Sequence, residues 1–271
     1  MIADAVDRRR IRAVGRKARL EVVFGVRRDR TVLTHAYAEP PFRIARPFPD
    51  GRGLRMMLAW SAPGIFGGDE LDQYVRVERG ACVHLMSQSA LQVHPSPDGA
   101  MATLRSTFHV DEAAHLGCEW DPLIPFAASR LKQRIAIRAA AGAVLWWSDA
   151  FMIGRQARGE RWRFDMLDHE LELSRGGCLD YLERFQLCPR RAGSPAAPWV
   201  GSAAAYFGTI VSSGRLVAER LDALADELAR RPGLRAGVDR LDDHLALVRL
   251  VGDHGGVFHE ARSRTRAFLR A

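Results

Sequence analysis

Four short segments of this 271-residue chain share one plan, in which an alternating apolar run is followed by a turn and a second apolar run. They are Val75–Leu85, Phe108–Leu116, Ile135–Leu145 and Leu171–Leu179. The copies recur at intervals of roughly thirty residues, a period that indicates stacked supersecondary units. This repeat limits the possible folds more strongly than any single motif in the chain.

We interpret each copy as a β-hairpin with one apolar face. Such a hairpin cannot bury that face alone, so neighbouring copies have to stack. The sequence therefore predicts a mainly β fold of stacked β-hairpins that form a layered or solenoid-like body. An ordinary β-sandwich, whose hairpins also recur, is the alternative.

The alternation begins well before the first copy. Leu20, Val22 and Phe24 lead into a charged turn at Arg27–Arg30, and Thr31–Tyr37 is expected to form the returning strand. Together with the four copies, this pattern predicts a β body that extends from about residue 15 to residue 211.

The C-terminal part, residues 212–271, changes to helical spacing. Ser213 is a candidate N-cap for a helix that extends to Arg231. Leu245–Val251 is apolar and short, which favours a strand, and Gly256–Leu269 has the spacing of a final helix. We expect a single domain over residues 1–271, with two helices toward its C-terminus.

The formal net charge of +8 favours acidic partners in general. Almost all of the positive charge is arginine, however, and it is spread along the chain with small clusters at Arg8–Arg10 and Arg27–Arg30. No basic segment interleaved with aromatic residues is present. We therefore expect no nucleic-acid partner.

The sequence gives no indication of export or membrane insertion. The four cysteines lie far apart without a CxxC pair, and Met1–Val14 lacks the apolar run of a signal peptide. No apolar stretch approaches the length of a membrane span. We expect a cytoplasmic protein with reduced thiols and no membrane partner.

The glycine-rich segment Pro63–Leu71 resembles a phosphate-binding loop only at first sight. It lacks the Lys-Ser/Thr of a P-loop, and a predicted strand follows it where a phosphate site needs a helix N-terminus. Its glycines at Gly64, Gly67 and Gly68 instead predict a tight turn that needs a positive φ angle at one or more of them.

No set of residues in the sequence forms a recognisable catalytic or tight metal site. There is no GxSxG motif, and the nine histidines form neither an HxH nor an HExxH arrangement. His84 lies inside a repeat copy, where a histidine is more often a packed strand residue than a metal ligand. We expect no tight metal site.

Several carboxylates lie at or beside the ends of predicted strands: Asp69, Glu70, Glu119, Asp121, Asp149, Glu160 and Glu183. Each is a solvated surface charge by default. If they line a channel, they would be weak oxygen ligands that pass a divalent transition-metal ion onward, since such ions prefer imidazole for tight binding. The alternative is a β-solenoid hydrolase or isomerase that uses the i, i+2 pair Glu119 and Asp121.

Five segments, in this order, resemble the urease accessory protein UreD (UreH) family. They are the glycine-rich turn Pro63–Leu71, the aromatic-Leu-Pro type segment Glu119–Phe126, Gly154–Arg155 with Gly159–Glu160, Leu182–Arg184, and Val200–Gly201 with Gly208–Val211. Where the family turn usually opens Pro-Gly-Gly, this chain has Ala62-Pro63-Gly64, and Asp121 is an added charge in the second segment. The positions that usually hold a Lys and a Tyr-Arg pair correspond here to Gln92, His94 and Pro95.

The resemblance implies a β-rich, non-enzymatic chaperone with two helices. It implies a role in maturing the nickel enzyme urease together with apo-urease and the accessory proteins UreF and UreG, of which UreG is the GTPase. It also implies transient Ni²⁺ passage without a tightly bound cofactor. Residue by residue, Asp69, Glu70, Asp149 and Glu183 resemble the family positions proposed for that route.

Overall fold

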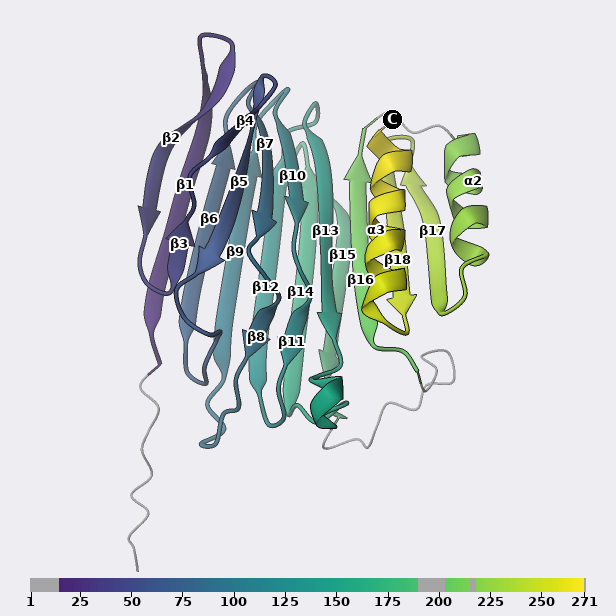
Figure 1. Ribbon diagram of the computed structural model, residues 1–271. Helices are drawn as coiled ribbons and strands as arrows, with labels where there is room; N and C mark the ends of the chain where they lie inside the picture. The colour runs from purple at the N-terminus through teal and green to yellow at the C-terminus, as the bar shows by residue number, and fades with distance from the viewer. Residues whose placement is uncertain (1–14, 190–202, 215–217, 271) are drawn as a thin grey trace, which may run out of the picture.

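The computed structural model describes residues 15–189, 203–214 and 218–270, and this part of the chain forms two facing β-sheets with two helices at one end (Figure 1). Arg8–Arg10 and Val200–Gly201, which the sequence analysis singled out, lie outside the described residues. No described helix is long and apolar enough to cross a membrane.

The first sheet has seven strands in the order β15-β14-β12-β9-β6-β1-β2. Its five central strands run parallel, whereas β15 and β2 pair antiparallel at its two edges. The strands are β1 (Lys17–Arg27), β2 (Arg30–Ala38), β6 (Glu70–Val77), β9 (Ala102–Val110), β12 (Arg130–Ala139), β14 (Met166–Arg175) and β15 (Cys178–Leu187).

The second sheet has eleven strands, and its main path is β17-β18-β16-β13-β10-β7-β5-β3. Its strands are β3 (Phe42–Ile44), β4 (Phe48–Asp50), β5 (Gly53–Trp60), β7 (Cys82–Ser87), β8 (Leu91–Val93), β10 (His115–Glu119), β11 (Leu123–Pro125), β13 (Val144–Met152), β16 (Tyr206–Ser213), β17 (Leu234–Asp242) and β18 (Leu245–Gly252).

The two strands of each of the first three repeat copies do not pair with each other. In the first copy β6 belongs to the first sheet and β7 to the second, so the turn between them crosses from one sheet to the other. Each strand pairs in parallel with its equivalent in a neighbouring copy, as Val75 does with Phe108 and Val83 with Leu116. The predicted hairpins are therefore wrong for these copies, and only the fourth, β14–β15, is an antiparallel hairpin.

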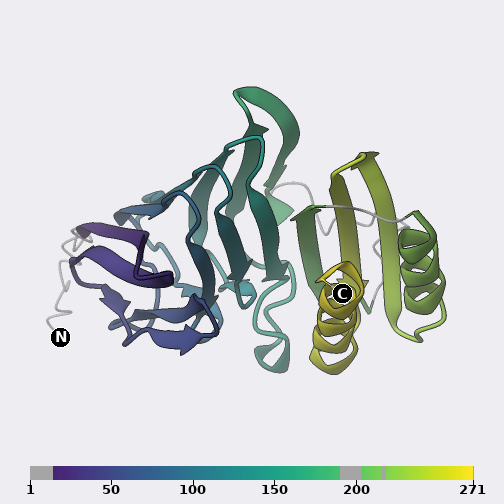
Figure 2. The ribbon, with the colours of Figure 1, turned by 90° about the horizontal axis from the view of Figure 1, so that it is seen from above.

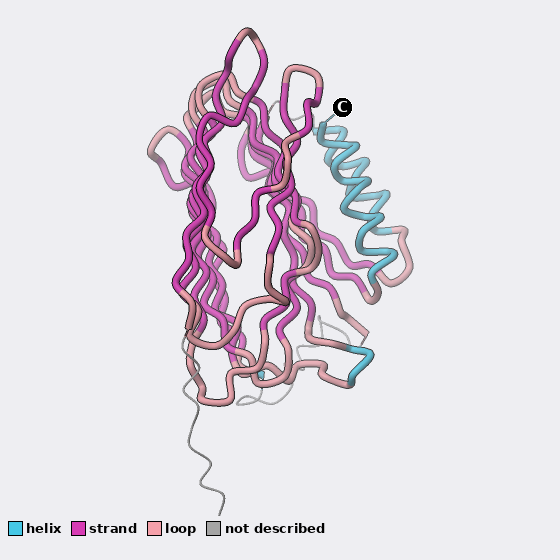
Figure 3. Tube along the Cα trace, turned by 60° about the vertical axis from the view of Figure 1, so that its left-hand side comes forward, coloured by secondary structure: helices cyan, strands magenta, loops and turns pink. Residues whose placement is uncertain are grey.

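This arrangement has a simple physical cause. Two strands that lie face to face across a turn bury their apolar faces against each other, while their backbone groups bond to the copies on either side. Figure 3 shows the resulting pair of layers. The prediction of a solenoid-like β body is confirmed, since stacked parallel coils replace the antiparallel pairing of an ordinary sandwich.

The C-terminal strands β16, β18 and β17 continue the second sheet in antiparallel order. Helices α2 (Ala218–Ala229) and α3 (Gly255–Arg270) lie against the outer face of this extension (Figure 2), where Leu224, Leu228 and Phe258 contribute to a second core. The prediction of two C-terminal helices is confirmed, but the predicted cap at Ser213 is wrong. Ser213 ends β16, and its Oγ accepts a hydrogen bond from the Leu145 amide.

Candidate functional site

A cavity of about 600 Å³ lies between the two sheets, and its lining extends from β1, β3 and β5 at one end of the solenoid to β16 and β18 at the other. Cavities of this size that are mostly apolar, with a few polar groups, are typical of ligand-binding sites. Aromatic side chains make up much of the wall: Phe42, Trp60, Phe108, Trp120, Trp147, Phe151, Trp162, Phe185 and Phe207.

A polar layer crosses this wall and connects both sheets. Asp149 of β13, Thr209 of β16 and Arg249 of β18 are neighbours in register, and Glu183 of β15 meets them from the first sheet. Glu183 is only 8% exposed and accepts hydrogen bonds from Thr209 Oγ1 at 3.0 Å and Arg249 Nη1 at 2.9 Å. The Tyr181 hydroxyl donates a third bond to Glu183 at 2.8 Å. These three donors occupy most, but not all, of the roughly four acceptor sites of the Glu183 carboxylate.

Asp149 has a different electrostatic environment. Its side chain lines the cavity, and no described lysine or arginine forms a direct ion pair with it; the Trp147 side chain and the charge of Arg262 favour its ionised form but do not outweigh burial. Burial and, after it, the negative charge of Glu183 raise the pKa of Asp149 from 3.8 to about 7. Asp149 therefore changes its charge near neutral pH.

His169 of β14 is a cavity residue that the sequence analysis did not select. Its Nδ1 lies 3.0 Å from Gln133 Oε1, and its ring stacks on Phe185 with centroids 4.8 Å apart. Burial lowers its pKa from 6.5 to about 4, so the imidazole is neutral at physiological pH. The sequence could have indicated this position, because His169 stands between Leu167 and Leu171 in the alternating pattern and residues two apart on a strand share a face.

Asp69 lies outside the cavity wall and is locked in a turn. Its side chain is 1% exposed and accepts hydrogen bonds from the amides of Arg16 and Phe66, each at 2.9 Å. The guanidinium of Arg16 forms an ion pair with the same carboxylate. Burial raises the pKa of Asp69, but the hydrogen bonds from Arg16 and the two amides outweigh it and hold the pKa below its usual range.

The neighbouring turn residues confirm the predicted turn geometry. Gly64 and Gly68 have φ angles of 154° and 82°. A Cβ at Gly64 would overlap the Gln92 carbonyl oxygen, and one at Gly67 would overlap the Ser96 hydroxyl. Glu70, by contrast, lies at the surface and forms an ion pair of 3.3 Å with an exposed lysine.

The segment after β13 is held by a clamp made from its own residues. Arg155 forms a bidentate pair with Glu160, whose Oε2 also accepts the Ala127 amide at 3.2 Å. Gly154 has φ 118°, and a Cβ there would overlap the Glu160 carbonyl oxygen. Gly159 has φ 69° and ends the 3₁₀ turn η1 (Gln156–Arg158). This motif therefore shapes a loop.

A column of stacked side chains joins the Asp69 turn to this clamp. Arg16 lies over the Phe66 ring, which stacks on His94 with centroids 4.3 Å apart. His94 meets the Phe126 ring edge-on at 5.0 Å, and Arg155 lies 3.7 Å above that ring. His94, one of the departures from the family pattern, thus packs between two aromatic rings at this end of the solenoid.

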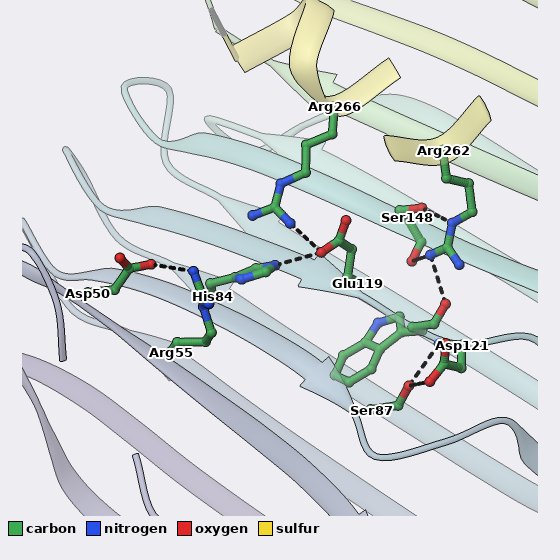
Figure 4. A network of polar contacts seen from close by, with 10 residues as sticks. Asp50, Arg55, His84, Ser87, Glu119, Asp121, Ser148, Arg262 and Arg266 are labelled. Atoms are coloured by element: carbon green, nitrogen blue, oxygen red, sulfur yellow. Dashed lines mark hydrogen bonds and ion pairs between the residues drawn. The ribbon is translucent and has the colours of Figure 1, made fainter. Parts of the chain in front are cut away.

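A second polar network fastens α3 to the outer face of the second sheet (Figure 4). Arg262 is 8% exposed and donates to Ser148 Oγ at 3.0 Å and to the Trp120 carbonyl at 2.8 Å. Glu119 pairs with Arg266 and lies 3.2 Å from Nε2 of His84, which is packed in β7 as expected.

The carboxylates of the enzyme alternative do not form a joint site. Glu119 is the last residue of β10 and takes part in the α3 network, whereas Asp121 lies beyond the strand and accepts a hydrogen bond from Ser87 Oγ at 3.1 Å. Asp121 borders the cavity and Glu119 does not. The prediction that one strand directs both toward a shared substrate is wrong, because the strand ends between them.

Within residues 15–189, 203–214 and 218–270, no group of three or more His, Cys, Asp or Glu side chains is arranged to hold a metal ion. The cavity offers Asp149 and Glu183 as a pair of oxygen donors. Two carboxylates without a third ligand suit brief contact with a divalent cation better than storage.

Comparisons with known proteins agree with this architecture. The sequence model of the UreD urease accessory protein family matches residues 16–271. The urease accessory protein UreD of Sorangium cellulosum is 33% identical over 241 residues, which cover 89% of this chain and 77% of the relative. UreD of Deinococcus radiodurans is 32% identical over 75% of each chain, and UreD of Lysinibacillus sphaericus is 27% identical over 91% of this chain and 92% of its own length. The chain therefore belongs to the UreD family of urease accessory proteins.

Proposed function

We propose that this chain delivers nickel to urease through its interior cavity, with Asp149 and Glu183 as the transient contacts of the ion. Its family makes it a non-catalytic chaperone that takes part in assembling the urease nickel metallocentre. The observation that carries the route is the meeting of two carboxylates, one from each sheet, in one cavity wall. Ni²⁺ is the cargo of this route, and the chain keeps no resident metal.

The four carboxylates that resemble the family's route residues have different tasks in this proposal. Asp149 and Glu183 line the cavity, whereas Asp69 and Glu70 are absent from its wall. Asp69 has its hydrogen-bonding capacity occupied by Arg16 and Phe66, so we assign it to holding the turn. Glu70 is half-exposed, and any contact it makes with nickel would be at the surface.

The partners proposed for this cytoplasmic chaperone are apo-urease and accessory proteins of the UreF and UreG types. Large exposed apolar side chains at sheet edges, among them Leu179 and Leu182 of β15 at 58% and 51% exposure, support a protein-binding surface. Co-expression with a UreF-type partner should raise the yield of soluble chain. Equal solubility with and without that partner would count against the assignment.

The test is a reconstituted urease maturation system in which bound nickel and urease activity are measured. Wild type should support activation, and Asp149→Asn and Glu183→Gln should still form the complex but deliver less nickel. Asp72→Asn is the matched control, because Asp72 is an exposed carboxylate on the outer face of the first sheet, paired with Arg105. If both cavity variants deliver nickel as well as Asp72→Asn does, the route does not use these carboxylates.

A further inference from the structure

The cavity wall is built in layers that follow the register of its strands. Trp147 is paired with Val211, Asp149 with Thr209, and Phe151 with Phe207. Because side chains two residues apart share a face, the charged layer lies about 7 Å from an apolar layer on either side. On β15 the same spacing places Tyr181, Glu183 and Phe185 in successive layers.

The layer beyond the charges is an aromatic belt. Phe151 stacks on Phe207 at 5.0 Å with an angle of 10° and packs against Phe185 at 5.5 Å. Trp162 closes the belt, with its ring edge-on to Phe207 at 5.9 Å. All four side chains border the cavity. The electron-rich faces of such rings attract cations, and organic ammonium ions above all.

The charges of the polar layer do not balance. Arg249 neutralises Glu183, and its guanidinium is held by that carboxylate and by the Tyr181 hydroxyl at 2.9 Å. Asp149 has no ion-pair partner among the described cavity side chains, and the Trp147 side chain and Arg262, on the other face of β13, offset the cost of its charge only in part. A buried carboxylate without a counter-ion is costly, and a bound cation would remove that cost.

We propose that this cavity is a binding site for a small organic cation, in which an ammonium head pairs with Asp149 and an apolar body lies against the belt of Phe151, Phe185, Phe207 and Trp162. The site does not rest on the nickel route, although both use Asp149. A neutral apolar molecule would leave the charge of Asp149 unpaired. At this layer an organic anion would meet two carboxylates and Arg249, which is already engaged; of the other arginines in the cavity lining, Arg184 pairs with Glu170 and Arg43 lies on β3.

Isothermal titration calorimetry on the full-length chain, without nickel, tests the proposal with three probes of one chain length: n-hexylammonium, 1-hexanol and hexanoate. Hexylammonium should bind saturably at pH 8, at least tenfold more tightly than hexanol, and hexanoate should give no saturable heat. Asp149→Asn should lower the hexylammonium affinity to that of hexanol. Asp72→Asn should retain the wild-type affinity, and Phe207→Leu should weaken the amine and the alcohol alike.

Equal affinities for hexylammonium and hexanol would mean that the cavity selects only for apolar bulk and would overturn the proposal. The same conclusion follows if no probe binds, or if Asp149→Asn binds hexylammonium as wild type does. The comparison of the three probes on wild type is independent of any variant's folding. Because these titrations contain no Ni²⁺, their failure would leave the nickel route untouched.

Discussion

Replacing Asp69 by asparagine separates a structural carboxylate from a metal-contacting one. Asparagine keeps the shape but loses the charge, and its amide nitrogen would face donors that now bind a carboxylate oxygen. In either orientation at least one of the amides of Arg16 and Phe66, together with a guanidinium N–H, loses its acceptor. The effect should therefore appear in stability before it appears in metal transfer.

The expected loss follows from these contacts. A buried backbone N–H left without an acceptor costs about 1 to 3 kcal/mol. The pair with Arg16 adds about 1 kcal/mol rather than more, since that side chain is 32% exposed and its charge is partly screened by solvent. Asp69→Asn should lower the free energy of unfolding by about 2 to 4 kcal/mol.

Urea denaturation of the purified chain, followed by circular dichroism at pH 7, measures this loss. Glu70→Gln is the matched control, because Glu70 and its partner Lys17 are both exposed, at 45% and 78% of their side chains, and such pairs contribute at most about 1 kcal/mol. The resolution of the method is about 0.5 kcal/mol. If the free energy of unfolding of Asp69→Asn lies within that margin of wild type and the variant still delivers less nickel, Asp69 acts on the metal directly and the turn-holding role is wrong.

Two further predictions concern the cavity and the clamp. Asp149→Asn should stabilise the chain at pH 8 but not at pH 4, by at most about 4 kcal/mol. The pKa of Asp149 is about 7 in the folded chain and 3.8 in the unfolded chain, so the wild type loses stability as the pH rises from about 4 through 7 and Asp149 becomes charged. Thermal melts of both proteins across this pH range test the prediction. Gly154→Ala should lower the free energy of unfolding by more than about 2 kcal/mol, and Gly159→Ala by about 1 kcal/mol. Both glycines have positive φ angles, but only Gly154 lacks room for a Cβ. Equal melting temperatures of the two alanine variants would contradict the steric argument.

The alternation of buried and exposed residues made the β body predictable. Val75 and Phe108 occupy equivalent positions in their copies and are register neighbours in the first sheet. The way in which the two strands of a copy associate was not predictable, because a hairpin and a turn between two sheets both satisfy the same alternation. Only long-range pairing, such as that of Val83 with Leu116, separates the two, and it leaves no local signal.

The site was predictable only in part for the same reason. Asp149 and Glu183 were predicted to lie at or beside strand ends, which is wrong, because Asp149 lies inside β13 and Glu183 inside β15. The sequence also does not show that strands of different sheets bring them into one cavity wall. The partner of Asp69 is Arg16, 53 positions away, so the locked geometry of the turn was also hidden. Motifs that are conspicuous in the sequence, such as the glycine-rich turn and Gly154–Arg155, shape loops at one end of the solenoid.

The cost of Asp149 is itself an argument about function. Glu183, Tyr181, Thr209 and Arg249 form a satisfied cluster that closes the two sheets without any contribution from Asp149. Asp149 is ionised only against burial and the charge of Glu183, so at neutral pH it lowers the stability of the fold. Packing would be served better by a neutral side chain at this position. A carboxylate that the fold does not need, directed into a cavity and bordered by aromatic rings, is explained by a cation that it receives, whether Ni²⁺ in transfer or an organic ammonium ion.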